Sequence, residues 1–191
     1  MTRPVEFTVD LEGRAVDSFA SARLTGERMT AAHASFLERM HTVPEVMASV
    51  GGVRTAEESA AWLTTQLDQW DTHGFGQWML RTRAADSTGE GDGELIGRGG
   101  LRMIDPCVGE ELVEVGYVLD SRAWGQGYAT EAAAAFIDIA AAHYGVTELG
   151  AITLKGNDAS TRVLEKNGFV FERWVEHKTG PHKFLRRVDQ N

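Results

Sequence analysis

The sequence of 191 residues contains a single cysteine, Cys107, and so excludes an intramolecular disulfide. It also lacks an apolar run of the about 20 residues needed to span a bilayer. The N-terminus carries Glu6 and Asp10 and has no apolar stretch of signal-peptide length. No histidine and cysteine positions combine in a zinc-ligand spacing. We therefore predict a cytoplasmic protein without a metal, because a lone thiol suits a reducing compartment.

Positive charge is also scarce, since 19 Lys and Arg stand against 28 Asp and Glu and give a net charge of -9. An acidic surface repels a phosphate backbone, so we expect no nucleic-acid partner. The same surface does not repel a cationic amine, and a local basic patch could still hold an anion. Hydrophobic residues make up 42% and charged residues 25%, which is the balance of an ordinary globular domain.

Strand and helix patterns alternate along the chain and indicate one α/β domain around a single sheet. The clearest strand is 111–120, and the clearest helix is the alanine-rich segment 128–144, which Gly145 ends. Residues 1–20 are weakly patterned and form either an extension or an extra strand, which leaves 21–191 as the domain. The other expected elements are strands over 22–29, 77–82, 94–104, 149–154, 169–174 and 183–188, helices from Thr30 and over 55–70 and 158–166, and an exposed loop over 84–93.

The segment 124–131, with the sequence WGQGYATE, joins the clearest strand to the clearest helix. Gly125 and Gly127 let the backbone curl tightly and approach a ligand. The first amides of the helix lack intrahelical partners and, with the helix dipole, favour an anion such as a diphosphate. A tight turn without a ligand explains this loop equally well. A Walker loop and a dinucleotide fingerprint both fit poorly, because no Gly-Lys-Ser/Thr follows Gly127 and Thr130 replaces the third glycine.

Four linked segments resemble the cofactor core of the GCN5-related N-acetyltransferase (GNAT) family over residues 111–172. In order they are VGYVL at 115–119, WGQGYATEA at 124–132, NDAS at 157–160 and LEKNGF at 164–169. Trp124 stands where the superfamily has a polar residue, and this is similar to the RimJ/RimL-like branch of N-terminal acetyltransferases. The resemblance implies a mixed, mostly antiparallel sheet that is splayed at the cofactor strand and has helices on both faces.

The resemblance also implies acetyl-CoA as cofactor and a primary amine as acceptor, either a peptide N-terminus or a small molecule. The strand end would pair with the pantetheine arm, and the amides of 125–130 would hold the diphosphate. Asn157 would face the pantetheine arm, cap a helix, or do both. A homodimer is a candidate assembly, and no membrane partner is expected. The predicted cofactor residues are Val118, Leu119, Asp120, Trp124, Gly125, Gln126, Gly127, Tyr128, Ala129, Thr130 and Asn157.

Acetyl transfer to an amine requires a proton acceptor for the amine and a proton donor for the departing thiolate. Glu114 is the candidate base, because it lies in a central strand where a carboxylate needs either a cleft or a partner. A solvent-exposed carboxylate and an ion pair with an arginine are its alternatives. The rival bases are His33, His41 and His73.

The resemblance makes Ser160 the candidate acid, with a first-turn hydrogen bond to the backbone as its alternative role. Tyr117 and Tyr144 do not occupy the place of the family's tyrosine, and Cys107 is expected to be structural. Two function classes follow: an N-acetyltransferase, and a non-catalytic acyl-CoA-binding or regulatory module on the same fold. A nucleotide-binding Rossmann protein is disfavoured by the missing third glycine.

Overall fold

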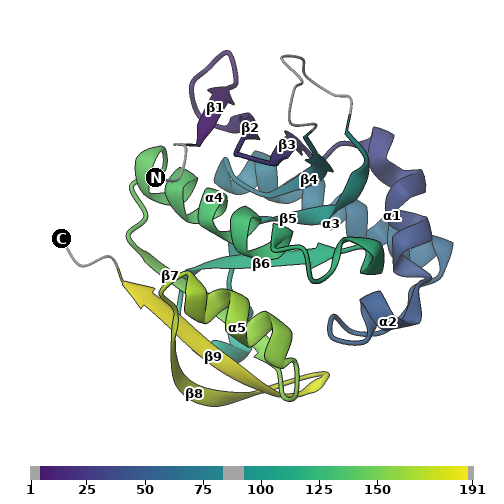
Figure 1. The fold of residues 1–191 in the computed structure, drawn as a ribbon, viewed down its shortest axis with the longest axis vertical. Coiled ribbons are helices and arrows are strands. Elements are labelled where there is room, and N and C mark those ends of the chain that lie inside the picture. Colours follow the sequence, from purple (N-terminus) through teal and green to yellow (C-terminus); the bar gives the residue numbers. More distant parts are fainter. Residues whose placement is uncertain (1–4, 84–92, 189–191) are drawn as a thin grey trace.

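The computed structural model describes residues 5–83 and 93–188. Its strands form one sheet in the order β1-β2-β3-β4-β5-β6-β7-β9-β8 (Figure 1). The strands are β1 Glu6–Val9, β2 Val16–Ala20, β3 Leu24–Arg28, β4 Gln77–Thr82, β5 Leu95–Met103, β6 Val113–Leu119, β7 Glu148–Leu154, β8 Val170–His177 and β9 Gly180–Val188. The α-helices are α1 Ala34–His41, α2 Pro44–Met47, α3 Ala56–His73, α4 Tyr128–Ala142 and α5 Asp158–Lys166.

The pair β6 and β7 differs from the rest of the described sheet because these two strands run parallel. The other neighbouring strands are antiparallel. Helix α4 forms the crossover that a parallel pair requires. Val113 pairs with Leu149 and Glu114 with Gly150, and beyond these positions the two strands separate. The predicted mixed, mostly antiparallel sheet, splayed at the candidate cofactor strand, is confirmed.

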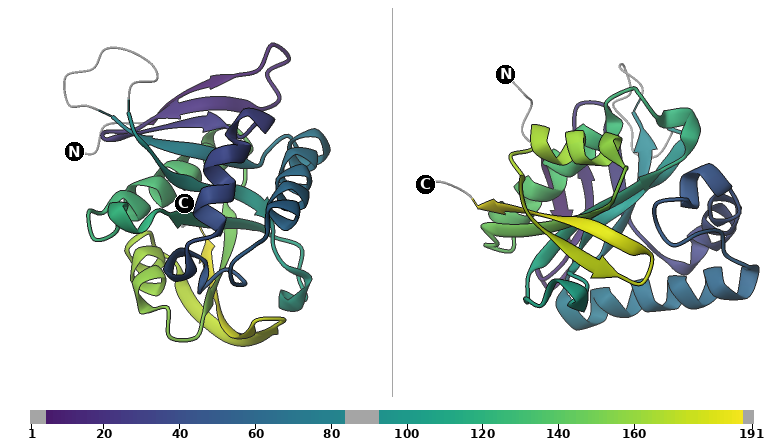
Figure 2. Two further views of the ribbon diagram at one scale, coloured as in Figure 1. Left: turned by 90° about the vertical axis from the view of Figure 1, so that its right-hand side faces the viewer. Right: turned by 90° about the horizontal axis from the view of Figure 1, so that it is seen from below.

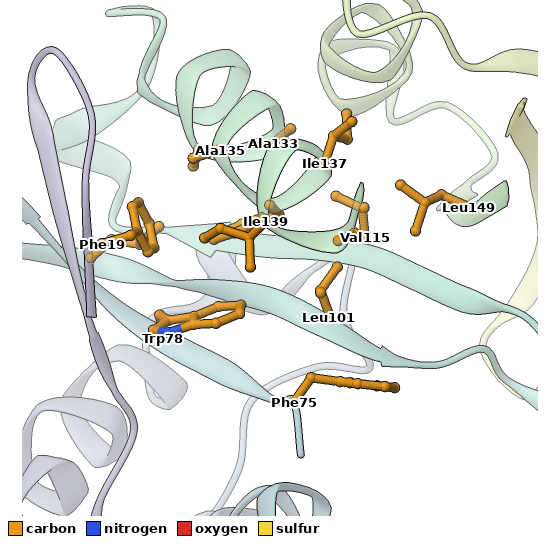
Figure 3. Close-up of a cluster of buried hydrophobic side chains, with 14 of the residues drawn as sticks. Phe19, Phe75, Trp78, Leu101, Val115, Ala133, Ala135, Ile137, Ile139 and Leu149 are labelled. Atoms are coloured by element: carbon orange, nitrogen blue, oxygen red, sulfur yellow. The ribbon is translucent and has the colours of Figure 1, made fainter. Parts of the chain in front are cut away.

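Helices cover both faces of the sheet, with α4 and α5 on one side and α1 and α3 on the other (Figure 2). Between α4 and the sheet lies a cluster of buried apolar side chains. Figure 3 shows Ile139 of α4 above the sheet, with Trp78, Leu101 and Val115 rising from the strands toward it. The alanines of α4 let the helix approach the sheet closely, and burial of this surface drives the packing. The core thus holds α4 rigidly against β6.

Local sequence signals account for most element boundaries. Thr55 caps α3, and its side chain and that of Glu58 form the reciprocal hydrogen bonds of a capping box, as the sequence indicates. Helix α4 ends at Ala142, slightly before the predicted position. Strand β2 was not assigned from the weakly patterned start of the chain. The loop predicted over 84–93 lies, apart from Gly93, outside the described residues.

Among the residues that the structure describes, membrane-spanning helices and clusters of metal ligands are both absent. None of their helices combines the length and the apolar composition that crossing a bilayer requires. Nor do three or more of their His, Cys, Asp and Glu side chains gather where they could hold a metal ion.

Candidate functional site

A cavity of about 690 Å³ opens where β6 and β7 separate, beside the amino ends of α4 and α5. Most of the predicted cofactor residues line it, namely Val118, Leu119, Trp124, Gly125, Gly127, Tyr128, Ala129, Thr130 and Asn157. Asp120 and Gln126 instead line a smaller hollow of about 210 Å³. The Asp120 carboxylate accepts a hydrogen bond from the Arg122 amide, and the Gln126 side chain donates to the Arg122 carbonyl. We call the larger space the cofactor cavity.

The turn before α4 has the backbone shape that its glycines permit. Gly125 has φ 74° and Gly127 has φ 82°, values that L-residues rarely adopt. Gly127 is the N-cap of α4 and, having no side chain, leaves the first amides of the helix without a side-chain cap. The cofactor cavity therefore borders amides that can donate to an anion, and these amides lie at the positive end of the helix dipole.

Arg23, just before β3, holds this turn in place from outside the cavity. Its Nε lies 2.8 Å from Glu131 Oε2, and its Nη1 donates to the Gln126 carbonyl at 2.9 Å. The other oxygen of Glu131 accepts from the Ser21 hydroxyl at 2.7 Å. Glu131 therefore joins the start of α4 to the β2–β3 turn, a role that is additional to complementing the helix dipole. Because these partners lie over 100 residues apart, the sequence alone did not reveal them.

Three cations line the cofactor cavity that the sequence analysis did not single out, namely Lys155, Arg162 and Lys166, and the carboxylate of Glu45 is also part of the lining. Arg162 and Lys166 are four residues apart on α5, and this spacing places both on one face of the helix. That spacing is the signal that could have identified them. The lining suits a ligand with several negative charges, although the whole chain is acidic.

A second cavity of about 330 Å³ lies on the α3 side of the sheet. We call it the acceptor cavity. It is lined by parts of α3, β4, β5, β6 and the β8–β9 turn. Seven residues line both cavities. Ser49 and Val50 follow α2, and the other five lie where β6, β7 and α5 meet: Tyr117, Val118, Leu154, Asn157 and Ser160. The separation of β6 from β7 therefore joins the two faces of the sheet.

Glu114 lines the acceptor cavity and is buried, with 3% of its side chain exposed. Both of its carboxylate oxygens accept hydrogen bonds from Arg102, from Nη2 at 2.8 Å and from Nε at 3.0 Å. Proximity to Glu114 raises the pKa of Arg102, so the guanidinium stays charged. Glu114 is thus both at the cavity and ion-paired, and the ion pair is one of the alternatives that the sequence left open.

The histidines of the acceptor cavity are His177 and His182, and the rivals named from the sequence lie elsewhere. His41 is fully buried against Ser59 and Trp62. Burial, together with the nearby Arg98 and Arg54, lowers the pKa of His41 to about 3, so it stays neutral. His33 bonds to Thr30, and His73 stacks on Phe75 at 5.5 Å between ring centroids.

His182 is a residue that the sequence gave no reason to select. Its Nδ1 lies 2.9 Å from the Gly180 carbonyl oxygen. Since a carbonyl can only accept, Nδ1 is the donor in this hydrogen bond, which leaves Nε2 as the ring nitrogen that can accept a proton. The ring centroids of His177 and His182 are 4.8 Å apart. Burial lowers the pKa of His177, which keeps that ring neutral near pH 7.

Ser160 lies at the junction of the two cavities, and its hydroxyl is 3.0 Å from the Tyr117 hydroxyl. Burial raises the pKa of Tyr117 to about 12, so this phenol stays protonated. The Ser160 amide donates to the Asn157 side chain at 3.1 Å, and Asn157 is the N-cap of α5. Tyr117 therefore belongs to the junction, although its place in the sequence differs from that of the family's tyrosine.

Cys107 and Tyr144 serve the fold and line neither cavity. Burial, with Asp105 nearby, raises the pKa of Cys107 to about 11, which disfavours a thiolate nucleophile. Tyr144 donates to the Gly74 carbonyl at 2.8 Å and accepts from the Val16 amide at 3.1 Å. These contacts connect the end of α4 to β2 and to the end of α3.

Comparison with known proteins adds to this geometry. A family model described as an acetyltransferase (GNAT) domain matches residues 23–170. The uncharacterised protein YkkB of Bacillus subtilis is 26% identical over 148 residues, which cover 78% of this chain and 81% of YkkB. An acetyltransferase from Agrobacterium tumefaciens C58 has the same fold, with a TM-score of 0.76, 23% identity and coverage of 96% and 97% of the two chains. RimL, a ribosomal L7/L12 α-N-protein acetyltransferase solved with coenzyme A, has a TM-score of 0.66, 17% identity and coverage of 88% and 95%.

Proposed function

Because this chain belongs to the acetyltransferase (GNAT) domain family, we propose that it transfers an acetyl group from acetyl-CoA to a primary amine at the junction of β6, β7 and α5. One observation carries the proposal. The cofactor cavity, beside the amino ends of α4 and α5, and the acceptor cavity, beside α3, share the residues of that junction. A thioester held in one cavity could then be attacked by an amine that enters from the other.

The residues of the cofactor cavity fit acetyl-CoA. Its volume of about 690 Å³ suits an extended ligand, and its cations suit phosphates. We propose that the amides of 125–130 hold the diphosphate and that the free edge of β6 pairs with the pantetheine arm. Asn157 faces the same arm while it caps α5. When bound, acetyl-CoA supplies the activated acetyl group, and the protein aligns it with the acceptor.

The acceptor must lose a proton as it attacks, and we propose Glu114 for this role. Its carboxylate lines the acceptor cavity, where Arg102 fixes its orientation. His182 is the second candidate, because its Nδ1 is engaged with the Gly180 carbonyl and its Nε2 is left to accept a proton. General-base assistance of this kind contributes roughly 100-fold or more to a rate.

The departing thiolate must gain a proton, and we propose Ser160 as its donor. Tyr117 remains protonated and lies within hydrogen-bonding distance of Ser160, so it can replace the proton that Ser160 gives up. No covalent bond to the enzyme is needed, which agrees with the suppressed acidity of Cys107.

The chemical class of the acceptor and the branch of the family to which the chain belongs are also proposals. The resemblance of the segment around Trp124 to the RimJ/RimL-like branch favours a terminal α-amine, on a peptide or on a small molecule. The alternative of a non-catalytic acyl-CoA-binding module predicts binding of the cofactor without any turnover.

The test is release of free thiol from acetyl-CoA in the presence of a panel of amines and peptides, with coenzyme A binding measured separately by calorimetry. We expect binding together with amine-dependent release of thiol. Binding without release for every amine would contradict the proposed transfer and favour the module. Absence of binding would remove the cofactor assignment itself.

A further inference from the structure

Arg98 of β5 is a buried cation that faces the acceptor cavity with part of its hydrogen-bonding capacity unused. It is 7% exposed. Its Nη1 donates to Gln77 Oε1 at 3.2 Å, whereas its buried Nε has no hydrogen-bond partner among the described residues. A buried charged group without full pairing is costly, and this cost points to a partner that arrives with a ligand.

Arg54 brings a second positive charge to the same cavity. The guanidinium carbons of Arg98 and Arg54 lie 4.1 Å and 5.7 Å from the centroid of the Trp62 ring, which both side chains contact. Arg54 donates to the Val50 carbonyl, and within residues 5–83 and 93–188 no carboxylate forms an ion pair with it or with Arg98. Burial lowers the pKa of Arg98 to about 9, with contributions from Arg54 and Arg102, so it is still charged at neutral pH.

The carboxylates that line the cavity are already engaged with other groups. Glu114 is held by Arg102, and Asp105 lies 3.4 Å from His177 Nε2 and accepts from the Cys107 amide. The Glu58 carboxylate partly offsets the charge of Arg54, whereas no described carboxylate that lines the cavity pairs with Arg98. A ligand that reached this region with a negative group would meet a guanidinium whose planar donors match a carboxylate.

We propose that Arg98 and Arg54 form a carboxylate-binding subsite, so that the acceptor is a small amine that also carries a carboxylate. This inference rests on the proposed function, because it specifies the acceptor of that reaction. Arg98 pairs across the sheet with Val118, a residue of the junction. A carboxylate bound at Arg98 thus leaves its amine a short distance from the place where the acetyl group is expected.

The positive charge of the subsite disfavours the binding of acceptors that carry several positive charges. The net charge of -9 would attract polyamines to the protein, but the acceptor cavity itself is lined by Arg54, Arg98, Arg102 and Lys178. Local charge at the point of binding outweighs the distant field, because screening in salt removes interactions beyond about 10 Å. Net charge alone pointed toward cationic acceptors, and the lining of the cavity points the other way.

The experiment compares kcat/KM for free amino acids with kcat/KM for their carboxamides, with spermidine as a polycation. Glycine, leucine and phenylalanine, each paired with its amide, sample three side-chain sizes. We expect at least one acid to exceed its amide by about tenfold or more. The amides have the larger fraction of free amine at neutral pH, so this bias works against the expected result. Equal or better use of every amide, or preferred use of spermidine, would overturn the subsite.

Variants connect the preference to the two arginines. Arg98→Gln and Arg54→Gln should each reduce the acid-to-amide ratio, with the larger loss for Arg98. Arg39→Gln is the matched control, because Arg39 is exposed on α1 and donates only within its own helix to the Ser35 carbonyl. A ratio that stays at the wild-type value in both cavity variants would contradict the assignment.

A binding measurement separates this inference from the proposed function and needs no variant. N-acetyl-L-leucine and N-acetyl-L-leucinamide are titrated by calorimetry into the wild-type protein saturated with coenzyme A. Tighter binding of the acid supports the subsite even if no amine releases thiol, in which case the transfer proposal alone fails. Equal binding of acid and amide, together with turnover of neutral amines, leaves the transferase intact and rejects the subsite.

Discussion

Glu114 shows how one side chain can satisfy two interpretations at once. The sequence indicated a carboxylate in a central strand that needed a cleft or a partner, and the structure gives it both. The carboxylate of Glu114 is buried, so loss of Arg102 would leave a buried charge without its partner. The pair therefore both orients the carboxylate and compensates its buried charge.

Replacing Glu114 by Gln is expected to lower kcat roughly 100-fold and to leave coenzyme A affinity unchanged, because the carboxylate lies in the acceptor cavity. Steady-state kinetics and calorimetry measure the two quantities. Arg102→Gln is the partner variant: it keeps the carboxylate but loses its orientation, so it should lower kcat by less than Glu114→Gln does and leave coenzyme A affinity unchanged. Equal losses in both variants would assign Glu114 a purely structural role, and His182→Gln would then be expected to abolish the reaction.

Ser160 and Tyr117 are expected to act as one unit. Ser160→Ala and Tyr117→Phe should each lower kcat, and the double variant should be no slower than the slower single variant, because a relay fails when either hydroxyl is lost. Single-turnover rates at saturating acetyl-CoA provide the measurement. Losses that simply add, or a Tyr117→Phe variant with wild-type turnover, would show that the two hydroxyls work independently.

At the scale of elements, the unit of β6, the glycine turn and α4 determines the site. A Cβ added at Gly127 would have one close neighbour among the described residues, Arg23 Nη2 at 3.4 Å. Gly127→Glu should place a negative charge beside the expected diphosphate and reduce coenzyme A binding below detection by calorimetry. Gly127→Ala carries the same backbone strain, about 1–2 kcal/mol, without the charge. The Gly127→Ala protein should melt at a lower temperature than the wild type yet still bind coenzyme A. Comparable affinity of the Glu and Ala variants for coenzyme A would refute the proposed role of the turn.

This unit of strand, turn and helix is also the part of the structure that the sequence predicted in most detail. The strand, the helix and the turn between them depend on local signals, such as the glycines at 125 and 127 and the alanines of α4. Strand β2 was missed because only Val16 and Phe19 are buried in it, which is not a strict alternation. The acceptor cavity could not be predicted, since Arg98, Trp62 and His182 come from three distant segments and meet only in the fold.

At the scale of the whole molecule, the charge that lines the two large cavities differs in sign from the net charge of the chain. The chain is acidic overall, yet cations predominate in both large cavities. Composition therefore gave no information about the charge of the site. The splayed sheet unites these regions, because the separation of β6 from β7 opens a route between its two faces.

The most direct measurement is a crystal structure of the protein with bound coenzyme A. We predict that diphosphate oxygens accept hydrogen bonds from backbone amides of residues 125–130. The pantetheine arm should run between β6 and β7, with its sulfur near Ser160. A turn that is empty or closed by a side chain, with coenzyme A bound elsewhere, would contradict the account.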